Sequence, residues 1–385
     1  MTPVTRRRLL AAASTMVATG LAGCEGNVEF GDNNSTATTQ PPPHTITEPV
    51  GDATVLPSLG VPLLTDAYTI TVRATQTLDG QELDELVITF PETFSLSGSL
   101  TYDDVAVRVG GPGSPTRQAN INDVRVGSDG TTLTLSPGSS VTLTATDTIV
   151  VEFRGVSAPV RTGEYLVGVE VNGAVSDSGA VTIASDFTPR ESTFETTTEG
   201  WTVVGDVQDG SVFPDRKSGD GDTGSYLSAE DDTTGDVWYW VAPRSFRGSK
   251  SPYIGGTLSF SLRQSTTEDQ FDAADVVLAS DEQVLYHDFG DETAHPGTDW
   301  TRYEVPLTPD AWLQETEAGG VSDVPDDGRL DRSEPADRET FESVLGSVET
   351  LHIRGEYVDG SDVGGIDSVA LAPGPGDEEP TETGS

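Results

Sequence analysis

Aromatic residues in the middle of the chain are of the types that bind sugars. Trp238 and Trp240 flank a tyrosine in WYWVAP, Tyr253 follows in SPYIGG, and Trp300 comes later. Exposed aromatic rings stack on the apolar faces of sugars, while nearby Asp, Asn or Arg side chains bond the hydroxyls. Two interpretations follow. Trp238, Trp240, Tyr253 and Trp300 form a ligand-binding site for a glycan, or at least one face of this strand packs in a core.

Residues for catalysis form no recognisable pattern. The four histidines, His44, His287, His295 and His352, lie far apart and in no metal-ligand spacing, and the sequence has no G-x-S-x-G or phosphate-binding loop. Nothing singles out a glycosidase-type carboxylate pair among the 64 Asp and Glu residues. We therefore predict that the protein is not an enzyme. A glycoside-active enzyme ranks third among the functions considered.

One acidic segment partly matches a calcium-binding loop. Between Asp323 and Glu334, suitable residues stand at positions 1, 5, 6, 9 and 12 of an EF-hand-type loop, but Pro325 occupies position 3, where a ligand is needed. A chain this rich in acids produces such spacing by chance. We interpret the segment as surface acids.

The composition is strongly acidic along the whole length. There are 64 acidic and 21 basic residues, which give a formal charge of -43 and a pI of about 4.1. Molar salt shortens the Debye length to about 3 Å and screens the resulting repulsion. This balance is typical of a halophilic, haloarchaeal protein, with an acidic extracellular protein of ordinary habitat as the alternative. It excludes a duplex nucleic-acid partner, since no basic patch exists.

The N-terminus carries export and anchoring signals. Residues 5–10, TRRRLL, resemble a twin-arginine (Tat) start, and the apolar run that follows is shorter than the roughly 20 residues that span a bilayer. Residues 21–24, LAGC, resemble a lipobox that ends at Cys24, the only cysteine. The sequence thus predicts a signal peptide over 1–23 and an exported lipoprotein, anchored on the outer face of the membrane through Cys24. The alternative for Cys24 is an unmodified thiol.

A polar segment follows the lipobox. Residues 24–50 are rich in Thr and Pro and include the run PPP, which predicts a disordered stalk. Overlapping sequons make Asn33 and Asn34 candidates for glycosylation, although sequons also arise by chance.

Residues 51–186 read as an all-β module. Eight short segments, from YTITVRAT to GAVTIA, alternate in polarity or run apolar and are separated by Asp-Gly, Gly-Pro and Asn-Gly turn signals. They predict an antiparallel β-sandwich. Residues 88–91, ITFP, and residues 163–165, GEY, resemble the Ig-like spacer modules of prokaryotic surface proteins, which implies an Ig-like fold. Without a convincing catalytic cluster, its expected role is that of a spacer.

Residues 187–373 read as a second β-rich unit. In residues 257–263, Leu258, Phe260 and Leu262 alternate with polar residues, which predicts a strand with one apolar and one wet face. FETTTEGW at 194–201 resembles an entry strand. Phe341, Val344, Leu345 and Val348 predict one short helix near 339–351.

The motifs of this second unit resemble those of the laminin B (laminin IV type A) domain. The resemblance covers roughly residues 194–373, and its motifs occur in the expected order. The matching residues are Tyr239, Ala242, Pro243, Phe246, Gly248, Tyr253, Gly255, Gly256, Leu351, Ile353, Arg354, Gly355, Tyr357 and Asp367.

This resemblance implies a galactose-binding-like jelly roll. Such jelly rolls often hold a structural calcium ion, and the candidate metal ligands here are Glu195, Asp220, Asp222 and Asp367. Solvated surface acids are the alternative.

The whole chain is expected to be a surface lipoprotein: signal peptide, stalk, Ig-like module, laminin-B-like domain and an acidic disordered tail over 374–385. Its expected function is extracellular recognition or adhesion, with glycans or cell-envelope components as ligands. A purely structural or assembly role in the cell envelope is the alternative.

Overall fold

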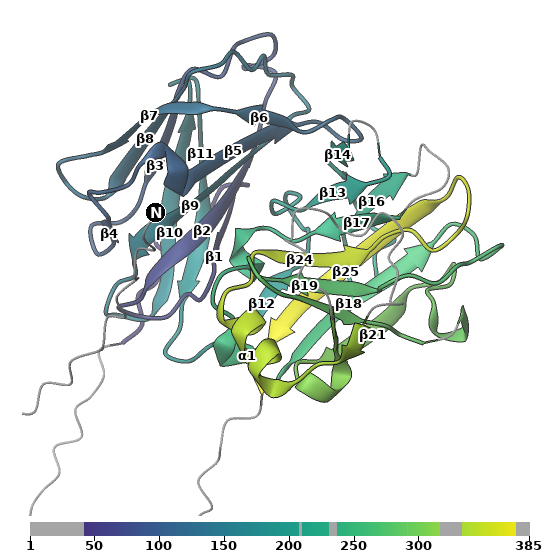
Figure 1. Ribbon diagram of the computed structural model, residues 1–385. Helices are drawn as coiled ribbons and strands as arrows, with labels where there is room; N and C mark the ends of the chain where they lie inside the picture. The colour runs from purple at the N-terminus through teal and green to yellow at the C-terminus, as the bar shows by residue number, and fades with distance from the viewer. Residues whose placement is uncertain (1–41, 208–209, 231–236, 291, 316–332, 375–385) are drawn as a thin grey trace, which may run out of the picture. The chain divides into compact units, whose positions relative to one another are not determined.

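Alternating strand sequences build two antiparallel β-sandwiches, and the chain is all-β apart from a few short helical segments (Figure 1). The computed structural model describes residues 42–207, 210–230, 237–290, 292–315 and 333–374. From Pro42 onward the chain forms one contact unit, distinct from residues 1–41.

The first sandwich has two sheets. In pairing order, the first sheet contains β1 (Thr54–Pro57), β2 (Thr65–Arg73), β9 (Thr148–Ser157), β5 (Val105–Gly110) and β6 (Arg117–Ala119), with β4 (Ser95–Leu96) paired to β9. The second contains β11 (Val175–Ile183), β10 (Gly163–Val171), β3 (Leu86–Thr89), β8 (Thr132–Pro137) and β7 (Ile121–Val126).

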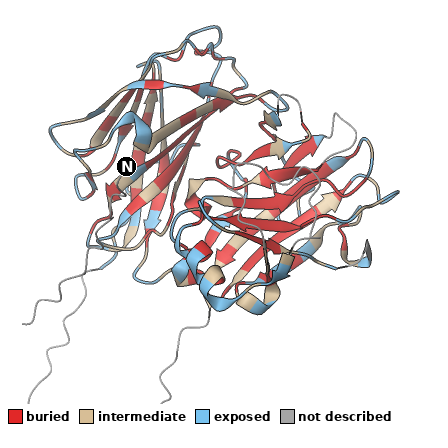
Figure 2. Cartoon of the chain, viewed as in Figure 1, coloured by how far each residue is buried: buried red, intermediate tan, exposed pale blue. Residues whose placement is uncertain are grey.

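The core of the first sandwich explains the strand patterns. Figure 2 shows buried residues recurring along the strands of this sandwich. Ile70 and Val72 of β2 and Val151 and Phe153 of β9 are fully buried in one cluster between the sheets. Their neighbours Thr69, Thr71, Val150 and Glu152 point to the other face of the sheet, because successive side chains in a strand alternate. These neighbours are buried too, so a second surface must cover this face.

The second sandwich also has two sheets. The first contains β15 (Asp215–Lys217), β16 (Tyr226–Glu230), β25 (Val363–Ala372), β18 (Thr257–Gln264) and β21 (Thr301–Pro306), with β12 (Arg190–Ser192) paired to β25. The second contains β14 (Ser211–Val212), β13 (Thr202–Gly205), β17 (Trp238–Val241), β24 (Thr350–Arg354), β19 (Val276–Ala279), β20 (Val284–His287), β22 (Leu313–Glu315) and β23 (Ser333–Pro335).

Helical structure in the described residues is limited. The predicted helix is present as α1 (Arg338–Gly346), but it ends before Val348, which pairs with Gly248 instead. Asp337 caps its N-terminus by accepting a hydrogen bond from the Thr340 amide, and Phe341 lies on its buried face. Single 3-10 turns are η1 (Tyr102–Asp104), η3 (Arg244–Phe246), η4 (Ser251–Tyr253), η5 (Glu292–Ala294) and η6 (Pro309–Ala311). No helix of the described residues is long and apolar enough to cross a bilayer.

Three local expectations are corrected. Residues 194–200 form no strand, because Phe194 and Glu199 have positive φ angles of 60° and 53°; β12 is the entry strand instead. The expected wet face of β18 is covered: Ser259 and Ser261 are buried, and Ser261 donates a hydrogen bond to Asp222. Within the predicted stalk, His44 pairs with Gly163 and its ring stacks on Tyr165, so the last part of this segment lies on the first sandwich.

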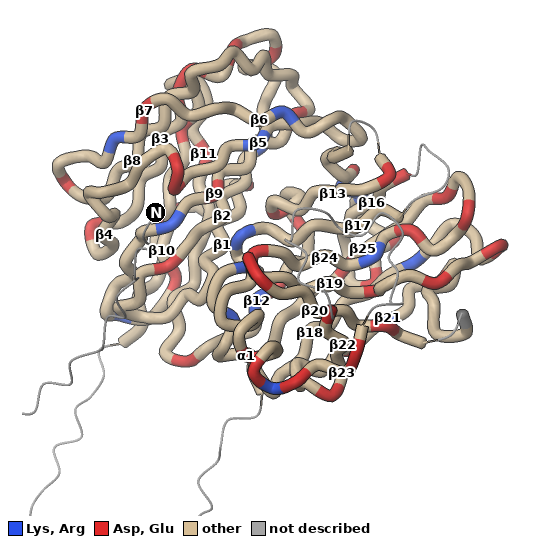
Figure 3. Tube along the Cα trace, in the orientation of Figure 1, with Lys and Arg blue, Asp and Glu red and all other residues tan. Residues whose placement is uncertain are grey.

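Acidic residues lie along strands and loops of both sandwiches, as Figure 3 shows. Several of the basic residues are instead buried or partly buried where the two sandwiches meet: Arg108, Arg190, Arg244, Arg247 and Lys250.

Candidate functional site: the junction and its polar groove

Glu152 of β9 is the centre of a buried charge cluster between the sandwiches. Its side chain accepts hydrogen bonds from Arg247 Nη2 at 3.1 Å to both oxygens and from the Arg244 amide at 2.6 Å, and it forms an ion pair with Arg108 Nη2 at 3.1 Å. Burial opposes ionisation of this carboxyl, but the charges of Arg108 and Arg247 outweigh burial and hold its pKa below the usual value. Glu152 therefore joins the first sandwich to the η3 turn of the second as an anion.

Lys250 makes a second buried contact. Its Nζ donates hydrogen bonds to Ser58 O at 2.9 Å, Ser58 Oγ at 2.6 Å and Ser245 O at 2.9 Å, and only 1% of the residue is exposed. Burial lowers the pKa of Lys250 to about 7, although the charge of Asp66 acts in the opposite direction. The amine thus satisfies three oxygens from both sides of the junction.

The free energy of unfolding should depend on pH through the protonation of Lys250. Its folded pKa of about 7 lies below the unfolded value, so protonation opposes folding, and this penalty should disappear as pH rises from about 7 towards 10. We expect Lys250→Met to remove that rise. Thermal melts of the wild type and the variant at stepped pH test this, with Lys217→Met as the control because Lys217 lies on the surface. Parallel stability curves for wild type and Lys250→Met would contradict it.

Backbone pairing extends the junction. The Gly113 amide donates to Phe213 O at 2.8 Å, the Phe213 amide to Ser114 O at 3.1 Å, and the Thr116 amide to Ser211 O at 2.9 Å. Gly110 makes room for the Phe213 ring, since a Cβ at this position would lie 2.3 Å from Phe213 Cδ2. Residues 112–116 thus add to the edge formed by β14, and the two sandwiches are held by more than a linker.

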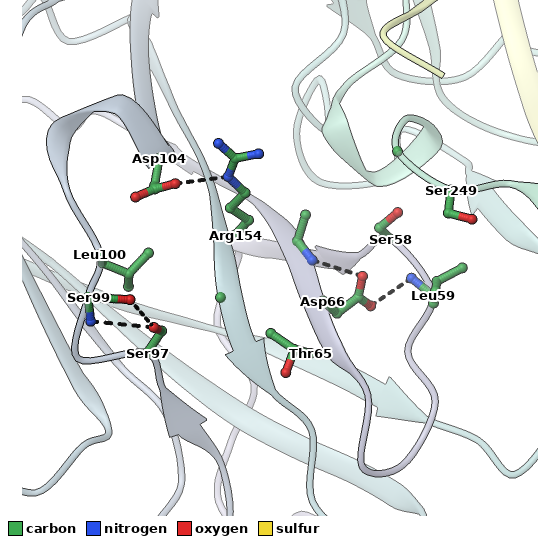
Figure 4. Close-up of a pocket in the computed structure, with 13 residues that line it drawn as sticks. Ser58, Leu59, Thr65, Asp66, Ser97, Ser99, Leu100, Asp104, Arg154 and Ser249 are labelled. Carbon is green, nitrogen blue, oxygen red and sulfur yellow. Dashed lines mark hydrogen bonds and ion pairs between the residues drawn. The ribbon is translucent and has the colours of Figure 1, made fainter. Parts of the chain in front are cut away.

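A polar groove opens beside this junction (Figure 4). It has a volume of about 420 Å³ and is formed by three segments of the first sandwich together with residues 248–249 of the second. Its hydroxyl groups come from Ser58, Thr65, Ser97, Ser99 and Ser249, its charged groups from Asp66, Asp104 and Arg154, and its apolar side chains from Leu59, Ala67 and Leu100.

The charged groups of the groove have different hydrogen-bond partners: Asp66 is held by backbone amides, whereas Asp104 and Arg154 pair with each other. Both Asp66 oxygens accept backbone hydrogen bonds, from Leu59, Gly60 and Ala67. Arg154 Nε donates to Asp104 at 2.9 Å, while its terminal nitrogens point away from that carboxylate in Figure 4. The Arg154 side chain is 62% exposed, so these donors are accessible to a ligand. No sequence pattern indicated this groove, because its lining residues Ser58 and Ser249 lie 191 positions apart.

The groove does not resemble a glycosidase site. Hydrogen bonds from the Thr101 backbone, then from Arg154, lower the pKa of Asp104, whereas the general acid of a glycosidase needs a raised pKa. Asp66 already holds three backbone donors.

Most of the predicted aromatic site lies in the core, and this corrects the prediction. Trp238, Trp240 and Tyr253 are fully buried, and the Trp238 and Trp240 rings contact each other edge to face at 5.0 Å. Trp238 and Trp240 share one face of β17 as expected, but that face lies between the sheets. Buried rings offer no surface to a sugar.

Trp300 is the one partly exposed member of the predicted aromatic set. Its Nε1 donates to Asp220 O at 2.8 Å, and its ring contacts Tyr226 at 5.3 Å and the Arg263 guanidinium at 4.8 Å. These contacts hold the ring in place, and a ligand role for Trp300 stays a prediction.

The predicted calcium ligands come from three segments that meet around residues 220–225. Glu195 accepts from the Ser225 amide at 3.2 Å, Asp367 from the Thr223 amide at 3.0 Å, and Asp222 from Ser261. The Asp220 carbonyl binds Trp300, and no group of three or more His, Cys, Asp or Glu side chains in the described residues is placed to hold a metal. The four residues are thus close in the fold, but their carboxylates do not converge on one point.

Several predicted features lie outside the described residues: Cys24, Asn33, Asn34, the acidic tail and nearly all of the EF-hand-type segment.

Comparison with known proteins supports the resemblance for the second sandwich. Residues 239–382 match the family model described as Laminin B (Domain IV). No curated protein sequence is significantly similar to the chain.

Solved structures give low-identity matches. The L4b domain of human laminin alpha-2 is 17% identical, with coverage of 48% of this chain and 98% of that one and a TM-score of 0.36. The group B streptococcus pilus 2b backbone protein is 15% identical, covering 50% and 84%, with a TM-score of 0.26. The tandem CBM22 domains from Paenibacillus barcinonensis Xyn10C are 11% identical, covering 85% and 99%, with a TM-score of 0.26.

Proposed function

We propose that this chain is an exported, halophilic surface lipoprotein that serves extracellular recognition or adhesion without catalysis. The support is the lipobox-like LAGC at Cys24, the sequons at Asn33 and Asn34, and the match of residues 239–382 to the laminin B family model. In this proposal Cys24 anchors the chain to the outer face of the membrane.

The polar groove is the observation that carries the proposed ligand class. Hydroxyl groups both donate and accept hydrogen bonds, and Arg154 adds free donors beside the Asp104 acceptor. Leu59 and Leu100 supply apolar contact next to these groups. A groove of about 420 Å³ with this lining fits a polyhydroxylated ligand, such as one or two sugar units of a glycan or cell-envelope polymer.

A glycan array tests this directly. Residues 25–385 would be used in molar sodium chloride, since they retain the whole contact unit that begins at Pro42. Any hit would be measured again with Arg154→Ala, for which we expect about tenfold or greater weakening because a charged donor is lost. Arg125→Ala is the matched control, since Arg125 is 71% exposed on β7 and does not line the groove. Equal affinities for the two variants would remove the groove from the proposal.

A purely structural role in the cell envelope is the second candidate. The burial of Trp238, Trp240 and Tyr253 favours it, because these aromatics stabilise the fold instead of facing a ligand. The hydrogen bonds and ion pairs between the two sandwiches also favour a structural role, because they hold the sandwiches together. An array without hits, together with an altered envelope in cells that lack the protein, would support this role over recognition.

We also propose that calcium stabilises the second sandwich at the loop between Glu195 and Asp367. Asp367 is fully buried, and burial raises its pKa above the usual value. A calcium ion would favour the ionised form. It would need backbone carbonyl ligands as well, which calcium accepts.

Melting experiments at fixed molar sodium chloride test the calcium proposal. Saturating calcium, at about 100 times its dissociation constant, should add about 2.7 kcal/mol of stability, and magnesium much less. Asp367→Asn should lose most of this gain, whereas Asp281→Asn, on the surface, should keep it. An equal response to calcium and magnesium would exclude a specific site.

A further inference from the structure

Two neighbouring loops of the first sandwich expose large apolar side chains. In the described residues Leu63 is 69% exposed, Leu64 37% and Val160 71%. The loops lie side by side, because β2 and β9 pair Thr65 with Ser157 and the Ala158 amide donates to Leu64 O at 2.9 Å. We call Leu63, Leu64 and Val160 the apolar tip.

Leu63 adopts a backbone conformation that leucine rarely takes. Its φ angle is 65°, in the left-handed region, where a bulky side chain is strained. A glycine would relieve this strain, yet the chain places a leucine there and leaves the side chain in solvent. The cost in stability suggests that the exposed leucine has a use.

The charge of the apolar tip differs from that of the rest of the molecule. Neither residues 60–65 nor residues 157–163 contain an acid, and their one charged residue is Arg161. Acidic side chains return on the adjoining segments, at Asp66, Glu164 and Asp186, of which Asp66 is buried. In a chain with a formal charge of -43, this end is locally apolar and basic.

Pro42 and Pro43, the first described residues, lie beside the apolar tip. Arg161, the neighbour of Val160, donates hydrogen bonds to the carbonyls of Pro42 and Pro43, and the His44 amide donates to Thr162 O at 2.7 Å. The 18 residues from Cys24 to Pro41 can span at most about 60 Å. If Cys24 is lipidated, the apolar tip is therefore within reach of the same membrane.

We propose that the apolar tip docks on the lipid surface to which the chain is anchored. Leu63, Leu64 and Val160 enter the interface between headgroups and acyl chains, and Arg161 faces the phosphates. A lipid surface fits better than a second copy of the chain, because three side chains on two loops are far too few for a stable protein interface of roughly 1,200 Å² or more. The proposal rests on the proposed lipid anchor.

Docking of this kind has a consequence for the groove. Thr65, which follows the apolar tip directly, lines the groove, and so does Asp66. The groove would then lie close to the membrane. Its ligand would be a sugar found there, such as the headgroup of a glycolipid or the inner part of an envelope glycan.

Vesicle binding by the unanchored chain tests the docking surface apart from the anchor. Residues 25–385 contain no cysteine, so Val160→Cys provides a single site for an environment-sensitive fluorophore. Val363→Cys is the matched control, because Val363 is an exposed valine of the second sandwich. With vesicles of phosphatidylcholine, with or without phosphatidylglycerol, we expect a blue shift for the label at position 160 only. No shift at position 160, or equal shifts at both sites, would overturn the proposal.

Substitutions supply the second readout. Leu63→Ser combined with Val160→Ser should reduce the vesicle partition coefficient about tenfold or more, whereas Val363→Ser should leave it unchanged. Leu63→Gly should keep or raise the melting temperature while vesicle binding falls, since it relieves the strain and removes the apolar group. A concentration-dependent shift at position 160 without vesicles would instead indicate self-association and sink the lipid assignment.

Two further measurements separate this proposal from the proposed function. Sugar binding in the groove should be unchanged in Leu63→Ser with Val160→Ser, and vesicle binding should be unchanged in Arg154→Ala. If Cys24 proves not to anchor the full chain to membranes while residues 25–385 still bind vesicles, only the lipoprotein proposal is refuted.

Discussion

Glu152→Ala is expected to reduce the free energy of unfolding by about 3–5 kcal/mol, because it leaves buried cations without their counter-charge. Arg108 and Arg247 would both lose their carboxylate, and the Arg244 amide would lose its acceptor. Burial already lowers the pKa of Arg108, and Glu152 is the group that favours its charged form. The effect should appear in chemical denaturation as a lower midpoint.

The same variant should also weaken the coupling between the sandwiches. We expect the single unfolding transition of the wild type to separate into two, since the variant loses the central contact of the junction. Glu304→Gln is the matched control: its pair with Arg302 is exposed, with a 3.6 Å separation, so it should change stability by less than about 1 kcal/mol. Similar losses for Glu152→Ala and Glu304→Gln would show that the junction contributes little.

Local sequence patterns were enough to predict most of the strands. The alternation in residues 105–110 and 132–137 and the apolar run in residues 148–155 predicted β5, β8 and β9 nearly to the residue. The run in β9 reflects a strand that is buried on both faces. The predicted all-β class is confirmed, because the described residues form four antiparallel sheets and one short α-helix. β1 was missed because it is an edge strand of four residues that ends in a proline and precedes the Gly and Pro residues of the 60–62 turn.

Which face of a strand is buried could not be decided from the same patterns. Trp238 and Trp240 were expected on one face, and they share it, but only the pairing of β17 with β13 and β24 determines that this face is covered. The hydroxyls of Ser259 and Ser261 predicted a solvent-exposed face. Instead, Ser261 donates a hydrogen bond to Asp222, and Ser259 accepts one from Arg302. Polar contacts between distant segments therefore decided burial where hydrophobicity alone was misleading.

The candidate site was less predictable than the fold. Glu152 stands in TIVVEFRG as one polar residue among apolar ones, and nothing local indicates that arginines from two domains surround it. The groove likewise combines residues from loops whose proximity depends on the sandwich topology and the junction. The resemblance to the laminin B family did point to Arg354 and Tyr357, but not to their partner Asp275, which lies in a segment without a motif.

Arg354→Leu is the second substitution with a large expected effect, about 3–5 kcal/mol of lost stability. Arg354 is fully buried on β24. Its guanidinium donates to Glu356 O and Phe271 O, both at 2.6 Å, lies 3.8 Å from the fully buried Asp275, and faces the Tyr357 ring at 4.2 Å. Leucine would fill part of the space but leave these carbonyls without the guanidinium donor and the Asp275 carboxylate without its cationic partner. Denaturant unfolding of the variant at pH 7 measures the loss.

The pH dependence of that loss distinguishes a missing charge from poorer packing. Burial raises the pKa of Asp275 to about 6, although Arg354 acts against the rise. Because this folded pKa lies above the unfolded value, protonation of Asp275 favours the folded state, and the contribution is lost as pH rises through about 6. Removing Arg354 makes the ionised carboxylate costlier, so the deficit of Arg354→Leu should shrink when pH falls from 7 to about 4.5. Arg338→Leu, which breaks an exposed pair with Glu342 on α1, should cost less than about 0.5 kcal/mol at either pH. A deficit of Arg354→Leu that does not change with pH would assign the role of Arg354 to packing alone.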